Sequence, residues 1–273
     1  MKILTLVENQ TINPALTPMH GLSVYIETER HRLLFDLGDK SVFLENASKL
    51  GVDIKNVDTL VISHGHHDHG GGLAAFLNEN AGADIYIREA AFLPHFGRTD
   101  DDFRRAGIDA GLRENTRLTF TGALHRIDDE LTLFSEIEST KLPSSANSFL
   151  YEETETGIVP DKFLHEQSLI IDTAEGLFLI AGCAHCGIVN IMERAEALKG
   201  REMDAVVGGF HLFNPGTGAT ENAELVNSLA SELSRRKSVY YTGHCTGTEA
   251  FELLRDTLGD RLHYLATGSQ FDL

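Results

Sequence analysis

The sequence predicts an α/β protein whose functional residues gather at the ends of its strands. Strand-like and helix-like stretches alternate along the 273 residues, and no internal repeat, low-complexity tract or obvious linker interrupts them. Several of the apolar runs end on a histidine. We therefore expect one domain that spans residues 1–273 and has a histidine-rich site at a sheet edge.

The N-terminal part of the chain has a regular pattern. Residues 22–27 alternate between apolar and polar side chains, and the apolar run 32–36 follows a polar turn, which is typical of a β-hairpin. Residues 41–50 place apolar side chains at helical spacing and are followed by Gly51, a helix stop signal. The pattern then predicts a strand over 57–62, the beginning of a helix over 73–77 and a strand over 84–87.

The pattern is weaker over residues 89–160. A polar run at 98–105 and short strand-like runs near Leu118 and Leu131 are separated by polar turns, and residues 144–148 have loop composition. A long weakly periodic stretch in a domain of this size is often a lid or a substrate-binding insert. A peripheral excursion of strands and loops fits the same residues.

The C-terminal part is regular again. The pattern predicts a hairpin of strands over 168–172 and 177–181, helices over 188–198 and 222–233, and strands over 205–211 and 239–245. Together with the strand before residue 64, four apolar runs lead into a histidine: His64, His185, His211 and His244. Because strand ends share an edge in an α/β architecture, these histidines can converge although they are distant in sequence.

Composition excludes several classes of protein. The net charge is −18, from 41 acidic against 23 basic residues, and no basic run interrupts it. Such a surface repels nucleic acid and anionic membranes, and no stretch approaches the roughly 20 apolar residues of a membrane span. An odd number of cysteines, three, does not suit a disulfide framework. We expect a cytoplasmic protein that acts on a small molecule, and an anionic substrate would need a local positive focus such as a bound metal ion.

The hexapeptide His64-Gly65-His66-His67-Asp68-His69 is the strongest signal. Neutral imidazole and carboxylate are the usual ligands of zinc and similar divalent ions. His64 and His66 project to the same side of an extended segment, while Asp68 and His69, past the turn, point to a position a few ångströms away. This spacing suits a two-metal site that activates water. His67 does not fit the pattern and is expected to face away or to support the ligands from behind.

The sequence resembles the metallo-β-lactamase superfamily in three features: the hexapeptide, Asp36-Leu37-Gly38 upstream of it, and the strand-borne histidines downstream of it. Further segments are similar to one subgroup, the metal-dependent hydrolases related to 7,8-dihydropterin-6-methyl-4-(β-D-ribofuranosyl)aminobenzene-5′-phosphate synthase: 20–23, 182–185, 209–212 and 244–247. The resemblance implies a four-layer αββα sandwich with its metals at one edge of the sheets.

The resemblance also implies a ligand set. Six side chains would hold two metal ions, with His64, His66 and His185 on one ion and Asp68, His69 and His244 on the other. Asp36 would orient the ligands by accepting an imidazole N–H. Superfamily hydrolases usually have a bridging aspartate where this chain has Cys183. Either Cys183 replaces it, or His185 and His211 redistribute the coordination. We expect one or two divalent ions, Zn²⁺ first, with Mn²⁺ or Fe²⁺ as alternatives.

Other histidines and cysteines have weaker cases. His165 lies near the place where many superfamily members have a metal-binding histidine and is an alternative to His185. His95 and His125 are expected on the surface, with contact to the substrate as the alternative. Cys183 and Cys186 form a C-x-x-C that could be a redox pair or half of a structural zinc site. Cys245, beside His244, is expected to be a buried structural thiol, with a ligand role as the alternative.

The resulting expectation is a hydrolase that uses metal-activated water on an ester, phosphoester or lactone. Asp68 would act at the metal centre and His211 would transfer a proton or contact the substrate. The subgroup relation implies a second reaction, the transfer of a dihydropterin methylene unit onto a ribosylaminobenzene phosphate. A di-iron redox protein and a metal-binding sensor without turnover are the remaining alternatives.

Overall fold

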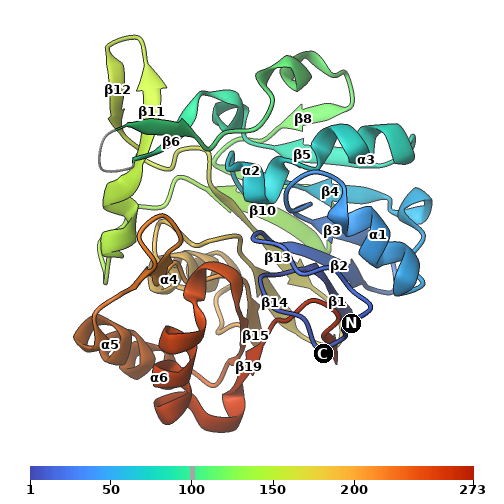
Figure 1. Ribbon diagram of the computed structural model, residues 1–273. Helices are drawn as coiled ribbons and strands as arrows, with labels where there is room; N and C mark the ends of the chain where they lie inside the picture. The colour runs from blue at the N-terminus through green and yellow to red at the C-terminus, as the bar shows by residue number, and fades with distance from the viewer. Residues whose placement is uncertain (99–101) are drawn as a thin grey trace.

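The computed structural model describes residues 1–98 and 102–273 as four layers, with helices outside and two sheets between them (Figure 1). Residues 99–101 of the polar run lie outside the described residues. The αββα sandwich implied by the sequence motifs is therefore confirmed. Within the described residues no helix is long and apolar enough to cross a membrane.

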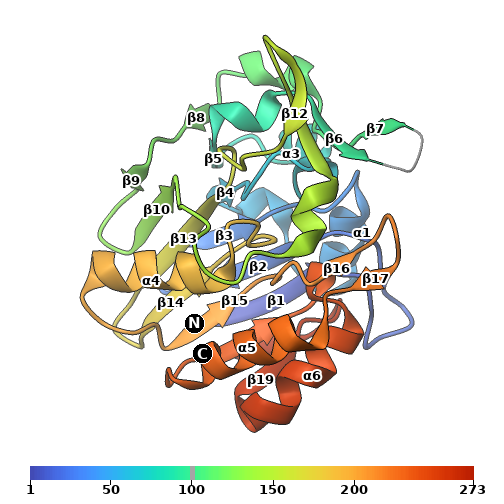
Figure 2. The same cartoon turned by 90° about the vertical axis from the view of Figure 1, so that its left-hand side faces the viewer.

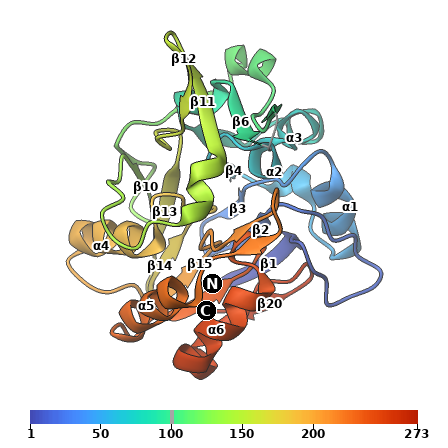
Figure 3. The ribbon, with the colours of Figure 1, turned by 60° about the vertical axis from the view of Figure 1, so that its left-hand side comes forward.

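The first sheet is formed mainly by the N-terminal part of the chain. Its strands, in spatial order, are β20 (Gln270–Asp272), β1 (Lys2–Val7), β2 (Ser23–Glu27), β3 (Arg32–Phe35), β4 (Thr59–Val61), β5 (Asp84–Ile87) and β8 (Leu118–Phe120). The predicted hairpin is β2 and β3, which pair antiparallel, whereas β3, β4 and β5 pair parallel. The C-terminal strand β20 pairs with β1, which brings the two chain termini together (Figures 1 and 3).

The second sheet comes from the C-terminal part. Its strands, in spatial order, are β19 (Leu262–Tyr264), β18 (Val239–Thr242), β15 (Ala205–Val207), β14 (Leu177–Ile180), β13 (Gln167–Asp172), β10 (Leu131–Ser135) and β9 (Leu124–Arg126). β13 and β14 form the predicted antiparallel hairpin, and β14, β15 and β18 run parallel. These parallel strands end at the same edge, where the histidines follow them.

Helices cover the outer face of each sheet. The first sheet carries α1 (Val42–Lys49), α2 (His67–Gly70) and α3 (Leu73–Glu79), and the second carries α4 (Ile188–Lys199), α5 (Ala223–Ser234) and α6 (Thr248–Leu258). The last three lie together against their sheet (Figure 2).

Alternation along the strands divides the apolar side chains among the layers. Leu33 and Phe35 pack between the two sheets, whereas Leu34, between them in sequence, packs toward the helices of the first sheet. The second sheet behaves in the same way, since Leu169 points inward and Ile170 points toward α4 to α6. Strands buried on both faces explain why several runs are apolar throughout.

The weakly patterned segment 89–160 has two parts. β8, β9 and β10 extend the main sheets. The rest forms a smaller sheet at one end of the sandwich, in the order β12 (Gly157–Pro160), β11 (Leu150–Thr154), β6 (His95–Arg98) and β7 (Phe103–Arg105) (Figure 3). A short ribbon, β16 (Phe213–Asn214) and β17 (Ala219–Thr220), lies after β15. Sequence periodicity missed the smaller sheet because its strands are short and mostly exposed.

The inter-sheet core predicts a contrast between two leucines on neighbouring strands. Leu133→Ala in β10 removes a fully buried side chain and is expected to lower the free energy of unfolding by about 2–5 kcal/mol. Leu124→Ala in β9, where the leucine is 53% exposed, is the control and should change it by no more than about 0.5 kcal/mol. Urea unfolding measures both, and equal losses would contradict this packing.

Candidate metal centre

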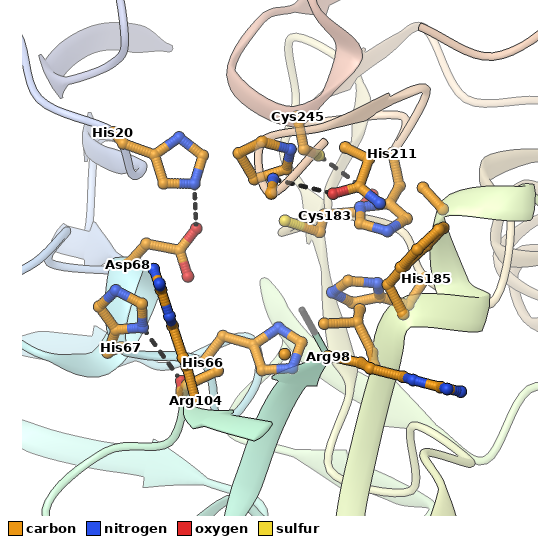
Figure 4. A pocket seen from close by; sticks show the side chains of 18 of the residues that line it. His20, His66, His67, Asp68, Arg98, Arg104, Cys183, His185, His211 and Cys245 are labelled. Atoms are coloured by element: carbon orange, nitrogen blue, oxygen red, sulfur yellow. Dashed lines mark hydrogen bonds and ion pairs between the residues drawn. The ribbon is translucent and has the colours of Figure 1, made fainter. Parts of the chain in front are cut away.

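The candidate metal centre lies at the ends of strands from both sheets. His64 follows β4, Cys183 follows β14, His211 follows β15 and His244 follows β18. The side chains of Cys183, His211 and His244 line one cavity together with those of His66 and Asp68 from the hexapeptide, and Figure 4 shows this cavity. Two facing sheets thus bring together residues that are far apart in sequence.

One group of nitrogen atoms comes from three histidines predicted to share an ion. The Nε2 atoms of His64 and His185 lie 3.3 Å apart. The His66 ring is 4.7 Å from the His64 ring and 4.9 Å from the His185 ring, measured between centroids. The structure therefore brings together His64, His66 and His185.

The second predicted group also converges. The Nε2 atoms of His69 and His244 lie 3.1 Å apart, and Asp68 Oδ2 lies 3.3 Å from His244 Nε2. His20 Nε2 lies 3.2 Å from the same carboxylate oxygen. His67, by contrast, is exposed, as its place in the hexapeptide predicted.

Asp36 orients two of these imidazoles. Its buried carboxylate accepts hydrogen bonds from the backbone N–H of Ser63 (2.7 Å), from Ser63 Oγ (2.6 Å) and from His69 Nδ1 (2.7 Å). Because the Ser63 hydroxyl proton is directed to Asp36, its oxygen accepts from His64 Nδ1 at 2.8 Å. Both histidines therefore carry a proton on Nδ1 and turn Nε2 inward.

Two asparagines orient the two facing histidines, His185 and His244, in a similar way. His185 Nδ1 donates to Asn147 Oδ1 (3.2 Å), and His244 Nδ1 donates to Asn9 Oδ1 (3.0 Å). Each amide nitrogen is held by the backbone carbonyl of the histidine that it orients, at 2.8 Å for Asn147 and 3.4 Å for Asn9. Sequence reasoning missed both residues; Asn9, two positions after the end of β1, carried the signal of a polar residue at a strand end.

The charge states of the first group suit metal binding. Burial and then neighbouring imidazoles hold the pKa values of His64, His66 and His185 below the ordinary histidine value. These rings are therefore neutral at neutral pH, the state in which imidazole binds a cation.

Asp68 and His69 have opposite charges. Burial alone would raise the pKa of Asp68, but the His69 imidazolium and hydrogen bonds from His20 and His244 lower it well below its usual value. Burial opposes the protonation of His69, yet the Asp36 and Asp68 carboxylates raise its pKa to about 9. A cation beside Asp68 would take the place of that positive charge.

Cys183 occupies a central position among the candidate ligands. Its Sγ atom lies 3.0 Å from His69 Nε2. Cys183 also belongs to three groups of possible metal ligands, and within each group the donor atoms all lie within 4.8 Å of one another. One of these groups adds His211 and Cys245. Burial raises the pKa of the Cys183 thiol, so the thiol needs a cation to ionise. Cys186 instead joins the apolar cluster below α4.

His211 joins the site without an assigned partner. It adopts a left-handed backbone conformation (φ +48°), which is strained for a residue with a side chain. Among the described residues neither of its ring nitrogens has a hydrogen-bond partner, although the ring is buried.

His165 belongs to a buried network with Asp161 and His95 that borders His66. Its Nδ1 accepts from the backbone N–H of Gly65 (2.9 Å) and its Nε2 donates to Asp161 (3.0 Å), so both nitrogens are engaged. His185, and not His165, faces His64 Nε2. The expectation that His95 lies on the surface was wrong, because its Nδ1 bonds to Asp161 (3.0 Å) and its side chain is fully buried. Sequence reasoning missed the carboxylate of Asp161 as a partner of His95, because the two residues are 66 positions apart.

The donor set fits a divalent ion of the zinc type. Pairs of Nε2 atoms face each other at 3.1–3.3 Å, close to the spacing of about 3.3 Å between two imidazole ligands of one tetrahedral zinc ion. His66 Nε2 is buried without a hydrogen-bond partner among the described residues. Imidazole and thiol donors favour zinc or iron over magnesium or calcium.

The cavity above these residues has a volume of about 420 Å³, ample for a small organic molecule. Its floor contains Asp68, His66, His185 and His211, and Figure 4 shows them facing a common space. His20, which begins the subgroup-like segment 20–23, lines it as well.

Comparison with known proteins agrees with this geometry. A model of the metallo-beta-lactamase superfamily matches residues 16–244. The chain is 28% identical to 7,8-dihydropterin-6-methyl-4-(beta-D-ribofuranosyl)-aminobenzene-5'-phosphate synthase of Methanocaldococcus jannaschii, over 98% of this chain and 95% of that protein. A second protein of that organism, the uncharacterized MJ0448, is 29% identical over 86% of this chain and 87% of its own length.

Solved structures show the same fold. Tm1679, a metal-dependent hydrolase of the beta-lactamase superfamily, superposes with a TM-score of 0.84 at 27% identity and covers 100% of this chain and 99% of its own. Zn²⁺-bound PqqB from Methylobacterium extorquens shares the fold alone, with a TM-score of 0.59 at 12% identity over the full length of both chains. The chain belongs to the metallo-β-lactamase superfamily.

Proposed function

We propose that this protein is a metal-dependent hydrolase that uses activated water on an ester, phosphoester or lactone. The observation that supports it best is that two pairs of Nε2 atoms face each other close to Asp68, below an open cavity. One pair comes from His64 and His185 and the other from His69 and His244. One or two divalent ions would bind there, Zn²⁺ first and Mn²⁺ or Fe²⁺ as alternatives. When bound, such ions supply Lewis acidity and lower the pKa of water.

Six residues would hold these ions as the sequence motifs imply, with His64, His66 and His185 in one group and Asp68, His69 and His244 in the other. The ionised Asp68 carboxylate would also orient the attacking water and take up its proton. Cys183 is proposed as an additional ligand at the position of the usual aspartate.

His211 is proposed to transfer a proton to the leaving group or to contact the substrate. Both of its ring nitrogens are without partners among the described residues, and the ring lines the cavity. An imidazole ring can accept a proton on one nitrogen and donate one from the other.

Transfer of a dihydropterin methylene unit is the second candidate reaction. It is supported by the similarity to the synthase of Methanocaldococcus jannaschii over nearly the whole of both chains. The same residues would then act on a diphosphate leaving group in place of an activated water. Hydrolysis is supported by the likeness to Tm1679 over a similar extent.

Part of segment 89–160 is proposed as a substrate-binding insert. Residues from β6, β7 and the loop before β11 line the cavity, among them Gly97, Arg98, Ala146 and Phe149. A small anionic molecule is the proposed substrate.

His64→Ala and Asp68→Asn are expected to abolish turnover and lower the metal content, since each removes a proposed ligand. The assay is cleavage of a p-nitrophenyl phosphodiester, together with elemental analysis of the purified protein. His67→Ala, in the same hexapeptide but outside both proposed ligand groups, is the control for metal content and should keep its metal, although the exposed His67 side chain also lines the cavity. Full activity in either ligand variant would refute metal catalysis.

The same preparations separate the reactions. Colourless protein with zinc or manganese that cleaves the phosphodiester supports hydrolysis. Release of pyrophosphate only when a pterin diphosphate and an aromatic acceptor are both present supports transfer instead. Iron with visible absorbance, in protein that shows neither of these activities, would support redox chemistry and contradict both.

Cys183→Ala tests the unusual ligand. If the thiolate binds an ion, the variant should lose about one equivalent of metal, as measured by elemental analysis. Cys186→Ala, which removes a thiol from the apolar cluster, should keep the metal content of the wild type. Equal metal content in both variants would exclude Cys183 as a ligand.

A further inference from the structure

We propose that Arg98, Arg104 and Arg105 form an anion-binding site at the rim of the cavity and recognise a phosphate or carboxylate group on the body of the substrate. This inference rests on the proposed function, because it takes the cavity as the substrate site. It adds a second positive focus, separate from the metal ligands.

The charge of the cavity contrasts with that of the chain. Acidic residues outnumber basic ones 41 to 23 overall. Among the described residues that line the cavity, however, three are arginines and Asp68 is the sole carboxylate. Figure 4 shows Arg98 and Arg104 among the side chains around it.

The three arginines are available for a ligand. Most arginines elsewhere in the protein form ion pairs, such as Arg30 with Asp128 and Arg88 with Glu136. Within residues 1–98 and 102–273, the arginines at the rim form none. Arg98 Nη1 donates to Tyr151 Oη (3.3 Å), which orients its guanidinium group and leaves its charge unneutralised.

The backbone ties these arginines to the metal motif. Ala106, directly after Arg105, accepts from the backbone N–H of His67 (2.7 Å) and donates to the carbonyl of His95 (2.8 Å). Ile108 donates to Gly65 (3.2 Å), so this segment pairs with the hexapeptide itself. Arg104 and Arg105 are thus held at a fixed position beside the candidate ligands.

The neighbouring residues leave room for a ligand with an apolar body. Gly97 lies opposite Arg104 in the β6–β7 pair, and a Cβ atom there would meet nothing within 4 Å. Phe149, Leu150 and Pro215 supply an apolar wall. A molecule with an aromatic or aliphatic body and an anionic group at a distance from the reacting bond matches this arrangement. Guanidinium groups pair with phosphate and carboxylate oxygens through two parallel hydrogen bonds, which a lysine cannot reproduce.

Binding of three inert probes with one aromatic body tests the proposal on metal-loaded protein. The probes are naphthylmethylphosphonate, naphthylacetate and naphthylethanol, and isothermal titration calorimetry measures their affinities. Arg104→Met combined with Arg105→Met, and Arg98→Met alone, should weaken phosphonate binding by about tenfold for each arginine removed. Naphthylethanol should bind within twofold of its wild-type affinity. Arg194→Met, an exposed arginine of α4 away from the cavity, is the matched control and should change nothing.

The anionic probes distinguish the source of the anion. A larger loss for the phosphonate supports a phosphate-bearing substrate, and a larger loss for naphthylacetate supports a carboxylate. Phosphonate affinity within twofold of wild type in the double variant, or an equal loss for naphthylethanol, would overturn the proposal. Because binding needs no turnover, an inactive protein with arginine-dependent binding would refute the proposed hydrolysis and leave this site standing.

Discussion

The buried carboxylate of Asp36 determines how the candidate metal centre is organised. It accepts three hydrogen bonds, one of them from His69 Nδ1, and through Ser63 it also fixes His64. An imidazole that donates from Nδ1 presents an unprotonated Nε2 on the other side. One carboxylate thereby prepares one histidine of each proposed ligand group. Asn9 and Asn147 repeat this arrangement for the histidines that come from the second sheet.

The sandwich makes this arrangement possible because two sheets contribute to a single edge. The first sheet supplies the hexapeptide after β4, and the parallel strands β14, β15 and β18 supply the residues that face it. Apolar packing between the sheets fixes the distance between these two sets of loops. The smaller sheet then closes one side of the cavity and brings arginines to its rim. Framework and specificity therefore come from different parts of the chain.

Local patterns could predict the framework and one half of the candidate site. The hexapeptide is contiguous, and the hairpin of β2 and β3 alternates clearly, so neither needs tertiary information. His95 was misjudged because its burial depends on Asp161, a partner 66 residues away. The roles of Asn9 and of the rim arginines could not be predicted either, since each depends on a contact between distant segments. Side chains that act through tertiary neighbours leave little trace in sequence periodicity.

The hydrogen bonds to Nδ1 leave the Nε2 atoms of His64, His185, His69 and His244 in position to bind cations. A crystal structure of the purified protein, with anomalous diffraction measured at the absorption edge of the metal found by elemental analysis, tests this most directly. We expect anomalous peaks about 2.0–2.2 Å from these Nε2 atoms, with Asp36 still hydrogen-bonded to His69 Nδ1. Peaks next to Nδ1 atoms, or peaks only at other places in the molecule, would contradict it.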